Sequence, residues 1–130
     1  MLPEEEKALV EFADSETHWM PFGQRKRRLP YGFVYGVSSR SIIGVAPPIP
    51  PILEGLAQRL VDAQIITKRA EQIVFQDYGA GTGFGEHVDA PVFGPEVCSI
   101  SLLSRCVCPF VTRCGRKFFA KSWNQGASLR

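Results

Sequence analysis

The hydrophobic periodicity of the chain changes near residue 70, and this change limits the folds that the chain can adopt. Apolar residues from Leu53 to Val61 recur at helical spacing, which is typical of the core-facing side of a helix. Further along, apolar and polar residues alternate between glycines, which predicts strands over residues 73–78, 84–89, 97–104 and 105–111. A chain with helices first and strands second is expected to belong to the α+β class.

Prolines mark the starts of the two expected helices. Pro3 and the three glutamates that follow it predict a helix through about Ala13, because proline and carboxylates both favour the first turn of a helix. A proline-rich segment that begins at Ala46 leads into a second helix, which is expected to end near Ala63.

The length of 130 residues suits one domain. No run approaches the roughly 18 apolar residues that span a bilayer, and the N-terminus has neither the basic nor the apolar region of a secretory signal. We therefore expect an intracellular protein, cytoplasmic or nuclear, that is neither secreted nor bound to a membrane. Its four cysteines lack the spacing of a zinc knuckle and are expected to be reduced thiols: Cys98, Cys106, Cys108 and Cys114.

Basic and aromatic residues interleave in the segment from Trp19 to Gly36. Four consecutive bases, residues 25–28, lie between Phe22 and the sequence Tyr-Gly-Phe-Val-Tyr-Gly. Such a pattern can grip a phosphate backbone and stack bases, although a solvated loop before an aromatic strand gives the same pattern. The formal net charge of +2 does not decide between these interpretations.

His87 stands two residues before Asp89 in the sequence Phe-Gly-Glu-His-Val-Asp. On a strand, residues i and i+2 project from the same face about 6 to 7 Å apart, so both side chains can reach one metal ion. They would be two of the three ligands in a facial triad, which holds non-haem Fe(II) through two histidines and a carboxylate. A histidine that merely packs beside a surface aspartate would give the same pattern.

The flanking motifs resemble those of the AlkB-like dioxygenases, a family that uses Fe(II) and 2-oxoglutarate. In that family a strand ending in Asn-x-Tyr and a glycine-bearing turn precede the His-x-Asp pair, and residues 72–89 are similar to this segment. Over residues 19–119 in all, further segments resemble family motifs in the same order: the Tyr-Gly-x-x-Tyr strand at residues 27–35, the proline-led helix at 47–60, and the Phe-Gly and Ser-Leu motifs at 93–95 and 99–102.

The resemblance implies a double-stranded β-helix, or jelly roll, with buttressing helices at the N-terminal side. Under this interpretation residues 1–130 form one AlkB-like domain, with a helical and lid part over about 1–70. The jelly roll begins over about 71–121, and a divergent tail follows at 122–130. We expect this jelly roll to be incomplete at the C-terminus.

The resemblance also assigns roles to individual residues. It implies that His87 and Asp89 ligate iron and that the hydroxyl of Tyr78 contacts the cosubstrate. Gln76, which stands where the family has asparagine, takes the second cosubstrate contact. The residues assigned to the substrate are Arg27, Arg28, Tyr31 and Tyr35.

In the family, 2-oxoglutarate is decarboxylated to succinate while dioxygen is used to hydroxylate an N-methyl group, which leaves as formaldehyde. The usual substrate is an alkylated base in nucleic acid, which must leave its stack to reach the iron. The resemblance therefore implies methylated DNA or RNA as the partner, with Fe(II), 2-oxoglutarate and dioxygen as the small molecules.

The chain departs from the family pattern after Asp89. The family's second histidine ligand and the arginine that pairs with 2-oxoglutarate are not found, because no histidine follows Asp89. The only other histidine, His18, precedes all of the motifs and is not expected to be a ligand. Two alternatives therefore stand beside the nucleic-acid demethylase: a catalytically incomplete fragment or binding module of the same family, and a dioxygenase that acts on protein.

Overall fold

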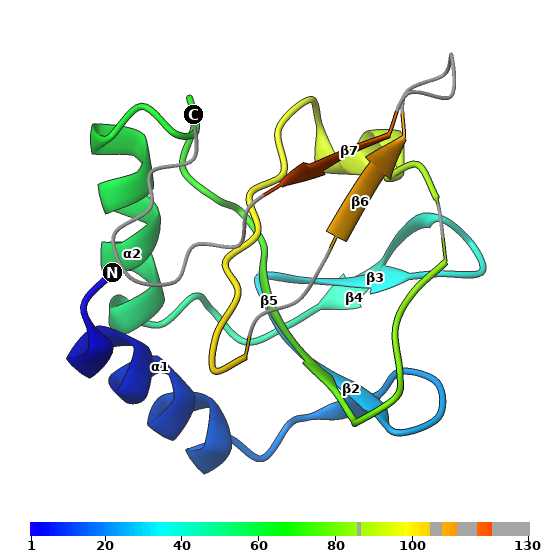
Figure 1. Cartoon of the computed structure of the whole chain (residues 1–130), viewed down its shortest axis with the longest axis horizontal. Helices are drawn as coiled ribbons and strands as arrows, with labels where there is room; N and C mark the ends of the chain where they lie inside the picture. The colour runs from blue at the N-terminus through cyan, green and yellow to red at the C-terminus, as the bar shows by residue number, and fades with distance from the viewer. Residues whose placement is uncertain (86, 105–107, 112–116, 121–130) are drawn as a thin grey trace. The chain divides into compact units, whose positions relative to one another are not determined.

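The structure is a computed structural model that describes residues 1–85, 87–104, 108–111 and 117–120 (Figure 1). It combines helices with small antiparallel sheets, which confirms the α+β class. No sheet within these residues closes into a barrel, and the jelly roll stays a prediction. The chain divides into two compact units, residues 1–14 with 99–130 and residues 15–98, and each is described by itself.

The first unit contains most of helix α1 (Pro3–Ser15) and a two-stranded ribbon. The helix begins at the predicted proline and carries three glutamates in its first turn, where they favour the positive end of the helix dipole. Leu9 and Ala13, one turn apart, are buried. In the ribbon, β6 (Cys108–Val111) pairs antiparallel with β7 (Lys117–Ala120).

A three-stranded antiparallel sheet, in the order β1-β2-β5, forms the framework of the second unit (Figure 1). It consists of β1 (Met20–Pro21), β2 (Lys26–Tyr31) and β5 (Ile73–Tyr78). Strand β5 has the bounds predicted from its alternating pattern. The register places Lys26 opposite Tyr78 and Tyr31 opposite Ile73.

Gly32 carries the chain from β2 into a second antiparallel pair, β3 (Phe33–Gly36) with β4 (Ser41–Val45). The N–H of Gly32 donates to the carbonyl of Pro47 at 2.8 Å, and its own carbonyl accepts from the N–H of Ala46 at 3.1 Å. Its φ of +84° is a conformation that glycine adopts readily and other residues do not. This position thereby ties the exit of β2 to the segment that leads into the next helix.

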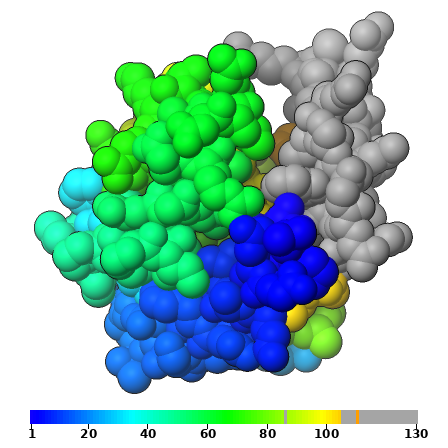
Figure 2. Space-filling view, turned by 90° about the vertical axis from the view of Figure 1, so that its left-hand side faces the viewer, coloured from blue at the N-terminus to red at the C-terminus, as the bar shows by residue number. Residues whose placement is uncertain are grey.

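Helix α2 (Pro51–Asp62) follows that proline-rich segment and ends one residue before the predicted end. Leu53 and Ala57, one turn apart, are buried, as the helical spacing predicted. Figure 2 shows the helix (green) beside the segment that precedes it. No helix in the described part of the chain is long and apolar enough to cross a membrane.

The prediction of strands at residues 84–89 and 97–104 is wrong, because the residues that the structure describes in these two ranges form no strand. Residues 91–93 form a 3-10 helix, and the neighbouring described residues have no ladder partner. Phe84, Val88 and Val97 are all exposed, so their alternation does not reflect a buried sheet face. The Glu96 carboxylate instead accepts hydrogen bonds from the backbone N–H and the hydroxyl of Thr67, at 2.9 and 2.7 Å.

We expect Gly32→Ala to lower the free energy of unfolding by more than about 2 kcal/mol, because strained backbone and steric overlap both oppose it. A Cβ at this position would lie 2.2 Å from the backbone oxygen of Glu71. Gly55→Ala is the matched control, since its Cβ meets no atom within 4 Å and alanine stabilises a helix interior by about 0.5–1 kcal/mol. Urea unfolding of both variants measures the difference, and equal stabilities would contradict the expectation.

Candidate metal and cosubstrate site

The side chains of His87 and Asp89 converge, although they lie on a loop and not on the predicted strand. The Nε2 atom of His87 is 3.3 Å from Oδ1 of Asp89, and each side chain is 54% exposed. The two ligand atoms are therefore close enough to contact one ion from the solvent-facing side. The proximity arises from the bend of the loop and not from strand alternation.

A backbone carbonyl orients the His87 ring. Its Nδ1 atom lies 2.8 Å from the carbonyl oxygen of Gly85. A neutral imidazole has one N–H, so it can donate to Gly85 or to Asp89 but not to both. With the proton on Nδ1, the lone pair of Nε2 faces the negatively charged carboxylate of Asp89, and the two repel each other. A cation bound between them, or a second proton on the ring, would turn this contact into an attractive one. Metal-binding histidines commonly show this arrangement, in which the other ring nitrogen donates to a carbonyl.

The described residues supply two candidate metal ligands at this position and not three. No group of three or more His, Cys, Asp or Glu side chains that could hold a metal ion occurs among them. His18 is held elsewhere: its Nε2 lies 3.1 Å from the carbonyl oxygen of Pro30, and its Nδ1 lies 3.3 Å from Glu16. The fit to a facial triad is thus partial.

Tyr78 and Gln76 project from the same face of β5, two residues apart. The Tyr78 hydroxyl donates to Oε1 of Gln76 at 2.5 Å, so the predicted cosubstrate pair is already joined. Phe84 lies between this pair and His87, because its ring centroid lies 5.9 Å from that of Tyr78 and 5.8 Å from that of His87. The glycine-bearing turn between β5 and His87 brings these rings together.

Strand β2 adds two cations to this face of the sheet. Lys26 is paired with Tyr78 and Arg28 with Gln76, and residues directly opposite in an antiparallel ladder project to the same side. Lys26 donates to the carbonyl of Gly83 at 2.9 Å. The sequence placed Lys26 among the four bases of residues 25–28 but not beside the cosubstrate pair, because that position depends on the register of two strands that are distant in the chain.

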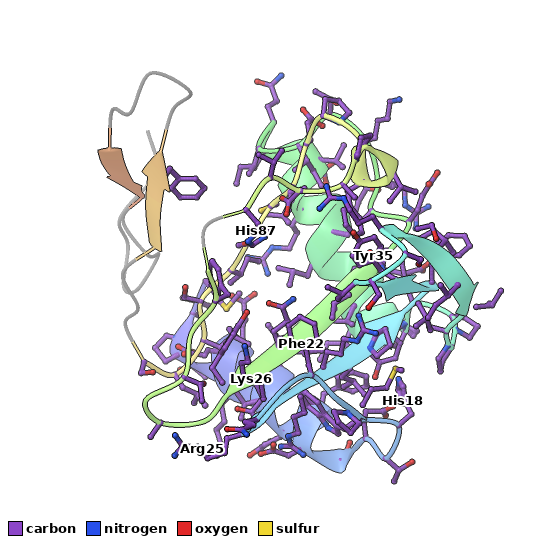
Figure 3. All side chains as sticks on the ribbon, turned by 90° about the vertical axis from the view of Figure 1, so that its right-hand side faces the viewer. His18, Phe22, Arg25, Lys26, Tyr35 and His87 are labelled. Atoms are coloured by element: carbon purple, nitrogen blue, oxygen red, sulfur yellow. The ribbon has the colours of Figure 1, made fainter. Side chains whose placement is uncertain are left out.

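Two of the predicted substrate residues, Arg27 and Tyr31, lie on the opposite face. Arg27 forms an ion pair with Asp77 at 2.8 Å, and its guanidinium carbon lies 4.2 Å from the centroid of the Trp19 ring. Tyr31 is only 2% exposed and packs edge-on against His18, with ring centroids 5.1 Å apart. Figure 3 shows Lys26 and Phe22 on one side of the ribbon and His18 on the other.

The remaining two substrate residues, Arg28 and Tyr35, contact each other. The Nη1 atom of Arg28 donates to the backbone carbonyl of Tyr35 at 2.7 Å, and the Tyr35 ring contacts the Phe93 ring at a tilt of 56°, with 4.6 Å between centroids. The Phe22 ring lies against both cations of this face. Its centroid is 5.5 Å from Nζ of Lys26 and 5.4 Å from Cζ of Arg28. Basic and aromatic groups therefore do interleave here in space as well as in sequence.

Comparison of the chain with protein-family models, with curated proteins and with solved structures finds no match.

Burial of Tyr31, with Glu16 beside it, raises the pKa of its hydroxyl above the ordinary value of 10. The folded state therefore favours the neutral phenol, while the unfolded chain loses this proton above about pH 10. We expect the free energy of unfolding to fall as the pH rises beyond 10. Tyr31→Phe should remove this part of the pH dependence while leaving the dependence below pH 9 unchanged. Denaturant unfolding of both proteins between pH 7 and 11 measures it, and parallel curves would refute the assignment.

Proposed function

We propose that the chain carries the metal-binding segment of an AlkB-like Fe(II)/2-oxoglutarate-dependent dioxygenase, which demethylates alkylated nucleic-acid bases oxidatively. One observation carries the proposal. An imidazole nitrogen and a carboxylate oxygen lie 3.3 Å apart at His87 and Asp89, with the other ring nitrogen on the carbonyl of Gly85. A metal-binding histidine typically has its other ring nitrogen on a carbonyl oxygen in this way.

In this proposal His87 and Asp89 hold Fe(II), and the carbonyl of Gly85 keeps the imidazole proton on Nδ1 so that Nε2 faces the metal. Bound together, Fe(II) and 2-oxoglutarate would supply the oxidising chemistry. Tyr78 and Gln76 offer a hydroxyl and an amide on the adjacent sheet face as polar contacts for the cosubstrate. The exposure of His87 and Asp89 leaves room for a substrate base to approach.

The proposed partner is methylated DNA or RNA, and the hairpin of β1 and β2 supports this choice. Its cation Arg27 lies over the Trp19 ring, with the guanidinium carbon 4.2 Å from the ring centroid. Cations can neutralise phosphates while neighbouring rings stack on bases. A protein substrate would have less use for such a surface.

We expect the chain to bind Mn(II), a redox-stable substitute for Fe(II), at His87 and Asp89. Paramagnetic broadening in NMR spectra should be strongest for residues 85–89. His87→Ala and Asp89→Asn should each weaken binding by more than the roughly ten-fold that loss of an outer hydrogen-bond partner costs. Asp77→Asn is the matched control, because it removes a carboxylate that already pairs with Arg27. Broadening that persists in both ligand variants would place the ion elsewhere.

The partial ligand set favours a second candidate, a catalytically incomplete member of the family that binds without turnover. The chain has two histidines, and His18 is held by Pro30 and Glu16 in the described structure. Two ligands hold Fe(II) more weakly than three and leave more of its positions to water.

We accordingly expect the 130-residue chain alone to release little succinate from 2-oxoglutarate, with or without a methylated oligonucleotide. Added imidazole should raise the rate by supplying the missing nitrogen ligand. A methylated peptide, assayed in parallel, tests the protein-directed alternative. Rapid succinate release without imidazole would contradict the partial ligand set, and His18→Ala would then show whether His18 completes it.

A further inference from the structure

We infer that Lys26 and Arg28 form an anion site on the face of β2 and β5 that binds the distal carboxylate of a five-carbon dicarboxylic acid beside Gln76 and Tyr78. The inference rests on the proposed function in one respect, since its ligand is the proposed cosubstrate. It assigns that ligand's charge to two residues of β2 that the sequence did not assign to the cosubstrate.

The ladder register places the four side chains together. Lys26 pairs with Tyr78 and Arg28 with Gln76, and all four project from one sheet face because their positions alternate with those of Arg27 and Asp77. Directly opposed side chains in such a ladder have Cβ atoms about 4.5–5.5 Å apart. The two positive charges are therefore next to the Gln76 amide, whose NH2 group can donate to the same anion, while the Tyr78 hydroxyl holds the amide oxygen of Gln76.

These two cations have no carboxylate partner among the described residues, whereas Arg27 pairs with Asp77 on the other face. Their contacts are with the carbonyl oxygens of Gly83 and Tyr35 and with the Phe22 ring. A carbonyl oxygen orients a cation but does not neutralise it. The positive charge of this face thus remains available to an anionic ligand.

Arg28 adds a more specific signal. Its Nη1 atom donates to Tyr35, but its Nε atom is buried and meets no hydrogen-bond acceptor in the described part of the chain. A buried N–H without an acceptor is costly, and the guanidinium edge that includes Nε is suited to a bidentate carboxylate. Entry of the carboxylate requires the Phe22 ring, which lies against both cations, to turn aside.

A row of aromatic rings leads from this sheet face toward His87 and indicates the direction in which the rest of the ligand extends. Tyr78, Phe84 and His87 follow one another with centroids 5.9 and 5.8 Å apart. A dicarboxylate held at one end by Lys26 and Arg28 can extend its other end along these rings toward His87. A single phosphate would use the cations but not this extension, and this difference distinguishes a dicarboxylate from a phosphate ligand.

The test is titration of the metal-free chain with glutarate, which has both carboxylates but lacks the 2-oxo group that chelates a metal. We expect saturable NMR shifts at the Gln76 and Tyr78 amides. Lys26→Gln and Arg28→Gln should each weaken binding about ten-fold or more, as expected for hydrogen bonds to a charged group. Arg27→Gln is the matched control, because it removes the same charge from the same strand on the opposite face. It should weaken glutarate binding much less than the other two variants do, since it only exposes the Asp77 charge on that opposite face.

Equal weakening in all three variants would overturn the inference, because it would indicate a general effect of charge. Tighter binding of inorganic phosphate than of glutarate would also overturn it and indicate a phosphate site. Lys26→Gln decides the outcome if Arg28→Gln fails to fold. Mn(II) binding, measured separately, distinguishes this inference from the proposed function. Glutarate binding without Mn(II) binding retains the anion site alone, and the reverse result retains the metal site alone.

Discussion

The antiparallel pairing of β2 with β5 is the interaction on which the candidate site depends. Six cross-strand pairs, from Lys26 with Tyr78 to Tyr31 with Ile73, fix which side chains share a face. A slip of one residue would move every side chain of β2 to the other side of the sheet. Arg27 would then lie beside the cosubstrate pair, and Lys26 and Arg28 would leave it. Gly32 and its bonds to the segment before α2 help to hold this register at the far end of the strand.

Local patterns in the sequence predicted the elements whose formation depends on local physics. Pro3 and Pro51 begin helices because proline suits the first turn, and the alternation in Ile73–Tyr78 gave the bounds of β5. Alternation failed at residues 84–89, where Gly85 weakens the preference for extended backbone and the described residues form no ladder with another strand. Alternating apolar and polar residues show that a segment is able to form a strand. A ladder also requires a second strand whose backbone N–H and C=O groups are free to pair with it.

The candidate site was predictable where its members are neighbours in sequence. His87 and Asp89 are two residues apart, so many backbone conformations bring their side chains together, and a loop does so here. The contribution of Lys26 was not predictable, because it depends on a pairing between strands that lie far apart in the chain. The separation of Arg27 from Arg28 follows from strand alternation, but the sequence did not predict a strand that starts at Lys26. The sequence shows four consecutive bases, and the strand conformation of residues 26–28 separates Arg27 from Lys26 and Arg28.

The ion pair between Arg27 and Asp77 has a consequence for the opposite face. Asp77 stands between Gln76 and Tyr78 in sequence, and a carboxylate on their side would repel the anion proposed to bind there. Strand alternation directs it to the other face, and Arg27, 2.8 Å away, offsets its charge. An exposed ion pair contributes little to stability, usually below about 1 kcal/mol. Its value here is electrostatic: by pairing with the one acid within Gln76–Tyr78, Arg27 leaves the field of Lys26 and Arg28 uncancelled at the candidate site.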